Sequence, residues 1–321
     1  MNIPDAGRDR IHVVAAAIID DRGRLLISRR AGHVHQGGLW EFPGGKLLPG
    51  EPIEAGLARE LREELGINVL SARPLIRIYH DYPDRPVLLD VWRVSAFAGE
   101  PSGREGQAVA WVANERLRRY RFPAANAPVL KAVSLPGRYL ITPEPGRDIP
   151  AFLAGLDRVL ARGVRLVQLR AKQLPIDKLS LLAPRVLTRC RQAGARLLLN
   201  AEPALAAELG MDGVHLTGPR LMNLPARPLD PVHLVGASCH TLAELQRACE
   251  LDLDFVVVSP VNATASHPGT RPMGFAGLRE FTEAASLPVY ALGGMREADL
   301  DAAFHSGAQG IAAIRGLWAG D

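Results

Sequence analysis

Cysteine is scarce in this sequence, and its three cysteines form neither a CxxC pair nor a spacing typical of metal ligands. We therefore expect Cys190, Cys239 and Cys249 to be packing residues in a reducing compartment. The sequence also lacks an apolar run of the roughly 20 residues that a membrane-spanning helix needs. The polar segment 1–10 does not have the layout of a cleaved leader. These absences predict a cytoplasmic protein without a membrane partner.

Lysine is almost as rare, with four residues, and most of the positive charge is arginine. The net charge is only +4, and the basic residues are scattered rather than clustered, so we expect no nucleic-acid partner. Small anionic substrates stay compatible with this composition. Hydrophobic residues make up 47% and charged residues 22% of the chain, which is typical of a folded protein. A length of 321 residues favours two domains.

The first 133 residues have a mixed pattern that predicts an α+β domain with a mixed sheet. Apolar segments at 13–19 and 25–28 flank an Asp20-Asp21-Arg22-Gly23 turn, which predicts a hairpin. A strong helical pattern covers 53–65. Further strands are expected at 75–79, 87–94 and 108–112.

After a linker at 134–137, the rest of the chain alternates regularly between short apolar strands and helical stretches. The eight strands are expected at 139–142, 166–170, 197–200, 213–217, 234–238, 255–259, 289–292 and 310–314. This alternation predicts a (β/α)₈ barrel over 138–321, and an open doubly wound sheet is the structural alternative. The proline-rich connection at 218–231 leaves open whether a helix forms there.

An acidic helix carries the most informative pattern. Pro52 suits its first turn, Gly66 suits the residue after its last, and the apolar residues from Ile53 to Leu65 share one face. Glu60, Glu63 and Glu64 stand at i, i+3 and i+4 and therefore lie close together. A solvated charged face is the ordinary explanation of such a helix. However, Glu64 lies only about 20° from Leu57 around the helix, where an unpaired carboxylate is costly unless it faces a cation.

The segment from Gly45 to Glu51, followed by Arg59 to Ile67, is a complete Nudix box, and residues 12–132 resemble the MutT group of that family. The resemblance implies hydrolysis of a nucleoside triphosphate to the monophosphate and pyrophosphate, with Mg²⁺ or Mn²⁺. It implies that Arg59 orients carboxylates and that Glu51 belongs to the catalytic box. The residues it implies near the metal are Gly44, Glu60, Glu63, Glu64 and Glu105. Taken alone, Glu105 would be a loop charge.

The flanking segments narrow the resemblance to enzymes that hydrolyse 8-oxo-dGTP. They include Leu39 to Lys46 and the Phe122-Pro-Ala-Ala-Asn126 segment, whose Asn reads the base in that group. An amide offers a donor and an acceptor side by side, which matches the O6 acceptor and N7 donor of 8-oxoguanine. Arg30, Gly45 and Lys46 complete the expected nucleotide site. The alternatives are that Asn126 only stabilises a turn and that Arg30 is solvated.

Residues 138–318 resemble the thiamine-phosphate synthase and TenI group of barrels. The matching positions come at the ends of expected strands, where barrel active sites form. They suggest a phosphorylated ligand of the thiamine pathway as a partner. The expected ligand site comprises Gln168, Arg170, Lys172, Asn200, Arg220, Ser238, His240, Thr264, Ser266, Gly293 and Gly294.

Three positions depart from the pattern of the synthases. Ala201 and Arg220 stand where both acidic metal ligands are expected, and His267 replaces a loop lysine. One interpretation is a barrel that has lost ordinary synthase activity and acts as a tautomerase-like or ligand-sensing module. Another is that Arg220 replaces the metal as a fixed cation facing a diphosphate. His240 suits either acid–base chemistry or a structural role.

Two alternatives to the combined function stay open. The Nudix half could act on a thiamine-related diphosphate, which would give both halves one metabolic purpose. The barrel could instead regulate the Nudix half without catalysing a reaction.

Overall fold

The computed structural model describes residues 10–30, 36–82, 86–264, 269 and 271–319. The chain divides between Ser134 and Leu135 into two compact units, each with its own hydrophobic core. Within the described residues, no helix combines the length and the apolar content needed to cross a membrane.

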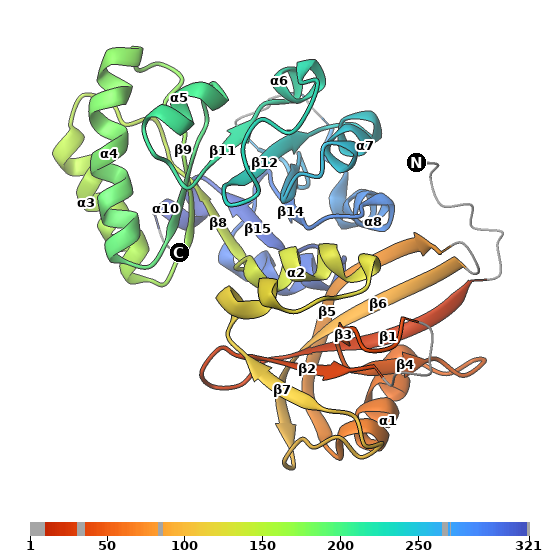
Figure 1. Ribbon diagram of the computed structural model, residues 1–321. Coiled ribbons are helices and arrows are strands. Elements are labelled where there is room, and N and C mark those ends of the chain that lie inside the picture. Colours follow the sequence, from red (N-terminus) through yellow and green to blue (C-terminus); the bar gives the residue numbers. More distant parts are fainter. Residues whose placement is uncertain (1–9, 31–35, 83–85, 265–268, 270, 320–321) are drawn as a thin grey trace. The chain divides into compact units, whose positions relative to one another are not determined.

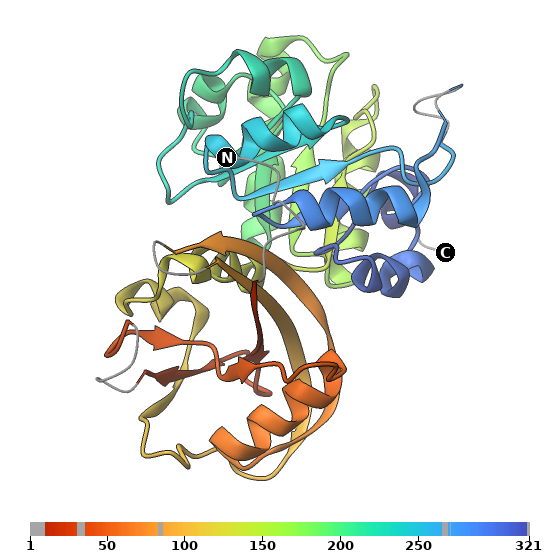
Figure 2. The ribbon, with the colours of Figure 1, turned by 90° about the vertical axis from the view of Figure 1, so that its right-hand side faces the viewer.

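The N-terminal unit contains two sheets (Figure 1). The four-stranded sheet has the order β4 (Gly44–Lys46), β1 (Ile11–Ile18), β6 (Pro86–Ala98) and β5 (Asn68–Asp81). The three-stranded sheet has the order β3 (Trp40–Glu41), β2 (Leu25–Arg29) and β7 (Val109–Val112). The long strands β5 and β6 pair along their length and curve together in Figures 1 and 2. The mixed sheet arises because β1 runs parallel to β6 and antiparallel to β4.

Strand β1 separates two cores because its side chains alternate between two faces. Ala15 and Ala17 join the cluster that includes Val129 of α2 (Ala127–Ser134). Val14 and Ile18 join the cluster that includes the apolar side of α1 (Ile53–Leu65). The 3₁₀ helices η1 (Asn114–Arg119) and η2 (Ala124–Asn126) precede α2.

The predicted hairpin at 13–28 is wrong, although the chain does turn there. Asp20 accepts hydrogen bonds from the backbone N–H groups of Arg22 and Arg24, and Gly23 has φ +72°. Only a single bridge, between Ile19 and Leu25, joins the two segments. Strand β1 is apolar on both faces, so it becomes a central strand between β4 and β6, while β2 pairs with β3 and β7. The turn fixed the reversal of the chain but not the choice of strand partners.

Helix α1 has the predicted bounds. Pro52 precedes it, and Gly66 ends it in the left-handed conformation at φ +75°. Leu57, Leu61 and Leu65 are buried against the sheet. The opposite side of the helix is left to carry charge.

The C-terminal unit is a closed barrel of eight parallel strands, as predicted. Its strands are β8 (Arg138–Ile141), β9 (Leu166–Leu169), β10 (Arg196–Leu199), β11 (Gly213–Leu216), β12 (Leu234–Cys239), β13 (Phe255–Val258), β14 (Val289–Ala291) and β15 (Gly310–Ala313). Its helices are α3 (Ile149–Ala161), α4 (Ile176–Gln192), α5 (Pro203–Glu208), α6 (Gly218–Asn223), α7 (Leu242–Glu250), α8 (Gly274–Ala284), α9 (Leu300–His305) and α10 (Arg315–Trp318), with the 3₁₀ helix η3 (Glu297–Asp299) before α9.

Pairing of β15 with β8 closes the barrel and excludes the open-sheet alternative. The proline-rich connection after β11 does hold a helix, the six-residue α6. The barrel interior is filled by Tyr139, Phe255 and Tyr290, whose ring centroids lie 5.2–5.7 Å apart. The interior is therefore a packed core, and a ligand can enter only at an end of the strands.

Candidate functional site

Arg59 organises the charged side of α1. Its Nε and Nη2 donate to the two carboxylate oxygens of Glu51, both at 2.9 Å. Its Nη1 donates to Glu60 at 2.8 Å and to Glu63 at 3.2 Å. Hydrogen bonds from Arg59 lower the pKa of Glu51 to about 2, so that carboxylate stays ionised. One guanidinium thus orients three of the predicted carboxylates.

Glu64 sits on the partly buried side of the same helix. Its pKa is raised to about 8, mainly by burial and also by the nearby carboxylates of Glu41, Glu105 and Glu60, against a hydrogen bond from the Gly44 N–H at 3.1 Å. A divalent cation would relieve this repulsion, and an all-oxygen donor set suits Mg²⁺ or Mn²⁺. Within the described residues, no three acidic, histidine or cysteine side chains already converge as an ion cage. Arg59 holds the carboxylates of Glu51, Glu60 and Glu63 instead.

Glu41 is a member of this acidic group that the sequence analysis missed. Burial raises its pKa, while the Arg30 guanidinium that is hydrogen-bonded to it opposes the shift. Its place between Trp40 and Phe42 looks like a packing segment in the sequence. Only the folded chain brings it close enough to Glu64 for its charge to raise the pKa of that residue.

Gly44 and Gly45 are needed where the loop before α1 meets its neighbours. A Cβ atom on Gly45 would lie 2.2 Å from a carboxylate oxygen of Glu60. On Gly44, which has φ +149°, it would lie 2.1 Å from the Val14 carbonyl oxygen. Glycine alone therefore lets β4 reach both the central strand and the acidic helix.

A pocket of about 250 Å³ opens beside this acidic group. Its lining includes Arg30, Gly45, Lys46 and Asn126, the four residues predicted to bind nucleotide. Asn126 is 8% exposed, and its side-chain amide makes no hydrogen bond to any residue that the structure describes. A buried amide facing a pocket is suited to pair with a ligand.

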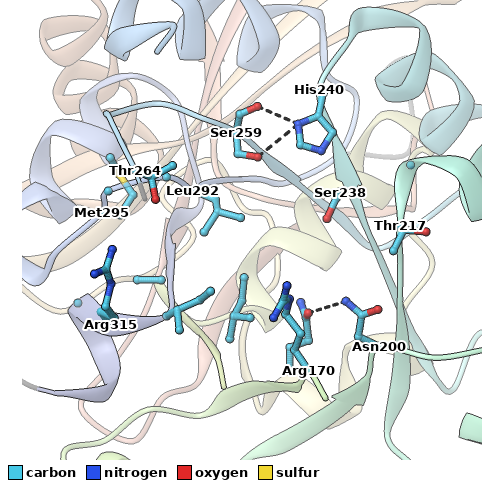
Figure 3. Close-up of a pocket in the computed structure, with 18 of the residues that line it drawn as sticks. Arg170, Asn200, Thr217, Ser238, His240, Ser259, Thr264, Leu292, Met295 and Arg315 are labelled. Atoms are coloured by element: carbon cyan, nitrogen blue, oxygen red, sulfur yellow. Dashed lines mark hydrogen bonds between the residues drawn. The ribbon is translucent and has the colours of Figure 1, made fainter. Parts of the chain in front are cut away.

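The barrel has a larger cavity, of about 840 Å³, at the carboxyl ends of its strands (Figure 3). Nine of the predicted residues line it: Gln168, Arg170, Lys172, Asn200, Ser238, His240, Thr264, Gly293 and Gly294. Ser266 and His267 lie outside the described residues. The sequence analysis missed two further cations in the lining, Arg296 and Arg315.

A buried chain of hydrogen bonds crosses the barrel and ends at this cavity. Asn200 donates to Gln168 at 2.9 Å, and Gln168 donates to the Tyr139 hydroxyl at 3.1 Å. Tyr139 lies 3.1 Å from Nδ1 of His215, whose Nε2 lies 2.9 Å from the Ser238 hydroxyl. Burial lowers the pKa of His215 to about 3, so its ring is neutral and carries one proton. Because the Tyr139 hydroxyl oxygen accepts from Gln168, the Tyr139 hydroxyl donates its own proton to Nδ1 of His215. Nε2 of His215 then carries the ring proton and donates to the Ser238 oxygen. The Ser238 hydroxyl is left to donate into the cavity.

Two other polar groups at the cavity are held by their surroundings. Nδ1 of His240 lies 3.0 Å from the Ser259 carbonyl oxygen, which fixes the orientation of the ring (Figure 3). Arg170 donates to Glu144 at 3.2 Å, and Glu144 also accepts from the backbone N–H groups of Lys172 and Gln173.

Arg220 is not placed as expected. Its Nε donates to Glu202 at 2.6 Å, and it is absent from the described lining of the large cavity. It lines a neighbouring hollow of about 580 Å³, which shares Lys172, Asn200 and Thr217 with that cavity. The Glu202 carboxylate, next to Ala201, neutralises Arg220. Arg220 is therefore not a free cation that takes the place of the metal.

Comparison with known proteins agrees with this division. A protein-family model described as "NUDIX domain" matches residues 14–132, and a family model described as "Thiamine monophosphate synthase" matches residues 138–317. The 8-oxo-dGTP diphosphatase of Escherichia coli K12 is 36% identical over 121 residues, 38% of this chain and 94% of that protein. The CTP pyrophosphohydrolase of the same strain is 38% identical over 119 residues, which are 37% of this chain and 88% of that protein. The thiamine-phosphate synthase of Thermus thermophilus is 37% identical over 179 residues, which are 56% of this chain and 86% of that protein.

Proposed function

We propose a function for each half of a chain that belongs to the Nudix family by residues 14–132 and to the thiamine monophosphate synthase family by residues 138–317. The Nudix half is a hydrolase of phosphorus-containing anhydrides. Its substrate is 8-oxo-dGTP, cleaved to the monophosphate and pyrophosphate. The observation that carries this choice is the buried Asn126 amide, which faces the pocket without a described protein partner.

Mg²⁺ or Mn²⁺ would be held by carboxylates of Glu60, Glu63, Glu64 and Glu105, with Gly44 beside them. When bound, the ion neutralises the triphosphate and activates the attacking water. The repulsion around Glu64 supports this assignment, since a cation removes its cause.

The chain's own groups position the substrate. Arg59 keeps Glu51 ionised and holds Glu60 in place. Arg30 and Lys46 supply positive charge at the pocket, while Asn126 pairs with the O6 and N7 edge of the oxidised base. Unmodified guanine offers two acceptors along that edge and leaves one amide group of Asn126 unpaired.

The test is hydrolysis by the full chain with Mg²⁺, comparing 8-oxo-dGTP, dGTP, CTP and thiamine diphosphate, with pyrophosphate and phosphate measured separately. We expect 8-oxo-dGTP to be preferred, pyrophosphate to be released and Glu64→Gln to be inactive. Preference for CTP would place the chain with the pyrophosphohydrolase relative. Preference for thiamine diphosphate would indicate that the Nudix half acts on a thiamine-related substrate, in line with the family of the barrel.

Asn126→Ala tests the base contact directly. We expect the ratio of kcat/KM for 8-oxo-dGTP over dGTP to fall about 10- to 100-fold, because a lost hydrogen-bond pair is worth about 1–3 kcal/mol. Asn114→Ala, in η1 and outside the pocket lining, is the matched control. An unchanged ratio in Asn126→Ala would reduce Asn126 to a turn residue.

The barrel binds a phosphorylated ligand of the thiamine type but lacks ordinary synthase activity. The support is that Ala201 and Arg220, which line the neighbouring hollow, stand in place of acidic metal ligands, and that no described residue in the lining of the large cavity is acidic. Formation of thiamine phosphate from the pyrimidine diphosphate and thiazole phosphate by the full chain would overturn this. Ligand-dependent change in Nudix turnover would instead assign the barrel a regulatory role.

A further inference from the structure

The large barrel cavity has an unusual charge for a relative of metal-dependent synthases. Four cationic side chains line it, namely Arg170, Lys172, Arg296 and Arg315, and no aspartate or glutamate occurs in the described lining. The neighbouring stretch 265–270, most of which lies outside the described residues, contains no acidic residue in the sequence either. The cavity therefore offers positive charge for an anion and no carboxylate for a divalent cation.

Acidic residues beside the cavity are already engaged, including Glu244, which accepts from the backbone N–H groups of His240 and Thr241. Glu144 accepts from Arg170 and from two backbone N–H groups. Glu202 is paired with Arg220. A divalent ion would have to displace these donors and would then face the cationic side chains of the lining, which makes its binding unfavourable.

Arg315 is placed for a different role. It is exposed, and its guanidinium makes no hydrogen bond or ion pair with the residues that the structure describes. The next residue, Gly316, packs tightly on the preceding loop, since a Cβ there would lie 2.3 Å from the Met295 carbonyl oxygen and 3.1 Å from Cα of Arg296. This contact brings the loops of two arginines together at one side of the cavity, where their like charges favour a bound anion.

Figure 3 shows Arg315 and Arg170 on two sides of the cavity, with Leu292 between them in the view. An arginine fork matches two oxygens of a phosphate group. We propose that the barrel cavity binds a phosphate monoester or diphosphate without a divalent cation, with the Arg315 guanidinium as its anchor. This inference rests on the proposed function of the barrel as a binder of phosphorylated ligands, and it assigns the contact with the phosphate to an arginine.

The experiment is calorimetric titration of the full chain with inorganic pyrophosphate, once in EDTA and once with Mg²⁺. We expect one pyrophosphate per chain to bind in EDTA, and Arg315→Ser to weaken this binding at least tenfold. Arg279→Ser removes the same charge from an exposed position on α8 outside the cavity and is expected to bind as the unchanged chain does. Arg315→Lys keeps the positive charge but lacks the forked guanidinium. Its affinity for pyrophosphate is expected to lie between the affinities of Arg315→Ser and the unchanged chain.

Binding seen only with Mg²⁺ and retained in Glu64→Gln would overturn the metal-free proposal, because Glu64→Gln disables the Nudix site. Binding in EDTA that Arg315→Ser leaves unchanged would overturn the choice of anchor. Absence of binding in both conditions would refute the proposed function of the barrel itself. Melting temperatures of the variants, measured without ligand, separate a lost contact from a misfolded barrel.

Discussion

At the scale of single residues, Glu64 is the side chain whose charge is costly until a cation is present. Its carboxyl group titrates near 4.5 in an unfolded chain and at about 8 in the folded protein. The folded state therefore binds more protons between these values, and its stability falls as the pH rises from about 4.5 to about 8. Glu64→Gln removes this loss, so the variant is expected to be the more stable at pH 8.5 in EDTA, by a few kcal/mol at most.

Thermal unfolding from pH 5 to pH 9 measures this difference. Glu54→Gln, an exposed change in the first turn of the same helix, is the control and should follow the unchanged chain. Added Mg²⁺ should narrow the gap by stabilising the protein that retains Glu64. A constant difference across the pH range would show that Glu64 does not titrate there.

The site residues that could be predicted have spatial neighbours that are also close in the sequence. The site residues that were missed have spatial neighbours that are distant in the sequence. Glu60 and Glu64 could be placed together because four residues make one helical turn. Glu41 and Arg315 could not, since each meets its neighbours only through the packing of separate strands and loops. Arg220 was expected at the large cavity but lines the neighbouring hollow, and its partner Glu202 could not be predicted from the motif.

At the scale of elements, the close approach of β4 to α1 sets the position of Glu60. Gly45→Ala would push a methyl group into the Glu60 carboxylate, at 2.2 Å before relaxation. We expect the Mg²⁺ concentration needed for half-maximal hydrolysis to rise about tenfold or more, with a smaller effect on folding because the carboxylate can swing away. Leu48→Ala, in the exposed loop that follows, is the control. Unchanged Mg²⁺ dependence would show that Glu60 need not stay at this position.

The hydrogen-bond chain inside the barrel leads to a second prediction at this scale. Tyr139→Phe leaves both the Gln168 amide and Nδ1 of His215 without their partner, and each unmet buried group costs about 1–3 kcal/mol. Tyr290→Phe removes a single bond, to the Pro136 carbonyl oxygen, and serves as the comparison. Denaturant unfolding of the barrel should show the larger loss in Tyr139→Phe. Equal losses would mean that the chain is not a connected unit.

Elements with strong local patterns were predicted well. Helix α1 is bounded by Pro52 and Gly66, and the barrel strands stand out as short apolar runs between helical stretches. Strand partners were harder to predict, because pairing depends on residues far away in sequence. Strand β1 shows this, since both of its faces are apolar and it pairs with β6, some 75 residues later, rather than with β2.

At the scale of the whole molecule, two units that share no hydrophobic core predict two separable unfolding transitions. Each ligand should move only the transition of the unit that binds it, by about 2.7 kcal/mol at a concentration 100 times its Kd. Pyrophosphate in EDTA should shift the barrel transition, and Arg315→Ser should remove that shift. Glu64→Gln should change only the other transition. Scanning calorimetry of the full chain measures both, and a single transition moved by both changes would indicate strong coupling between the units.

The pairing of β15 with β8 also governs the order in which the protein can fold during its synthesis. The last strand of the Nudix half ends at Val112 and its last helix at Ser134, so this half can fold while the barrel is still being translated. The barrel strand that begins at Arg138 must wait for the one that begins at Gly310. At ordinary ribosomal rates this wait is about 10–30 s. A ribosome-bound chain can therefore carry a finished hydrolase while one edge of β8 stays unpaired.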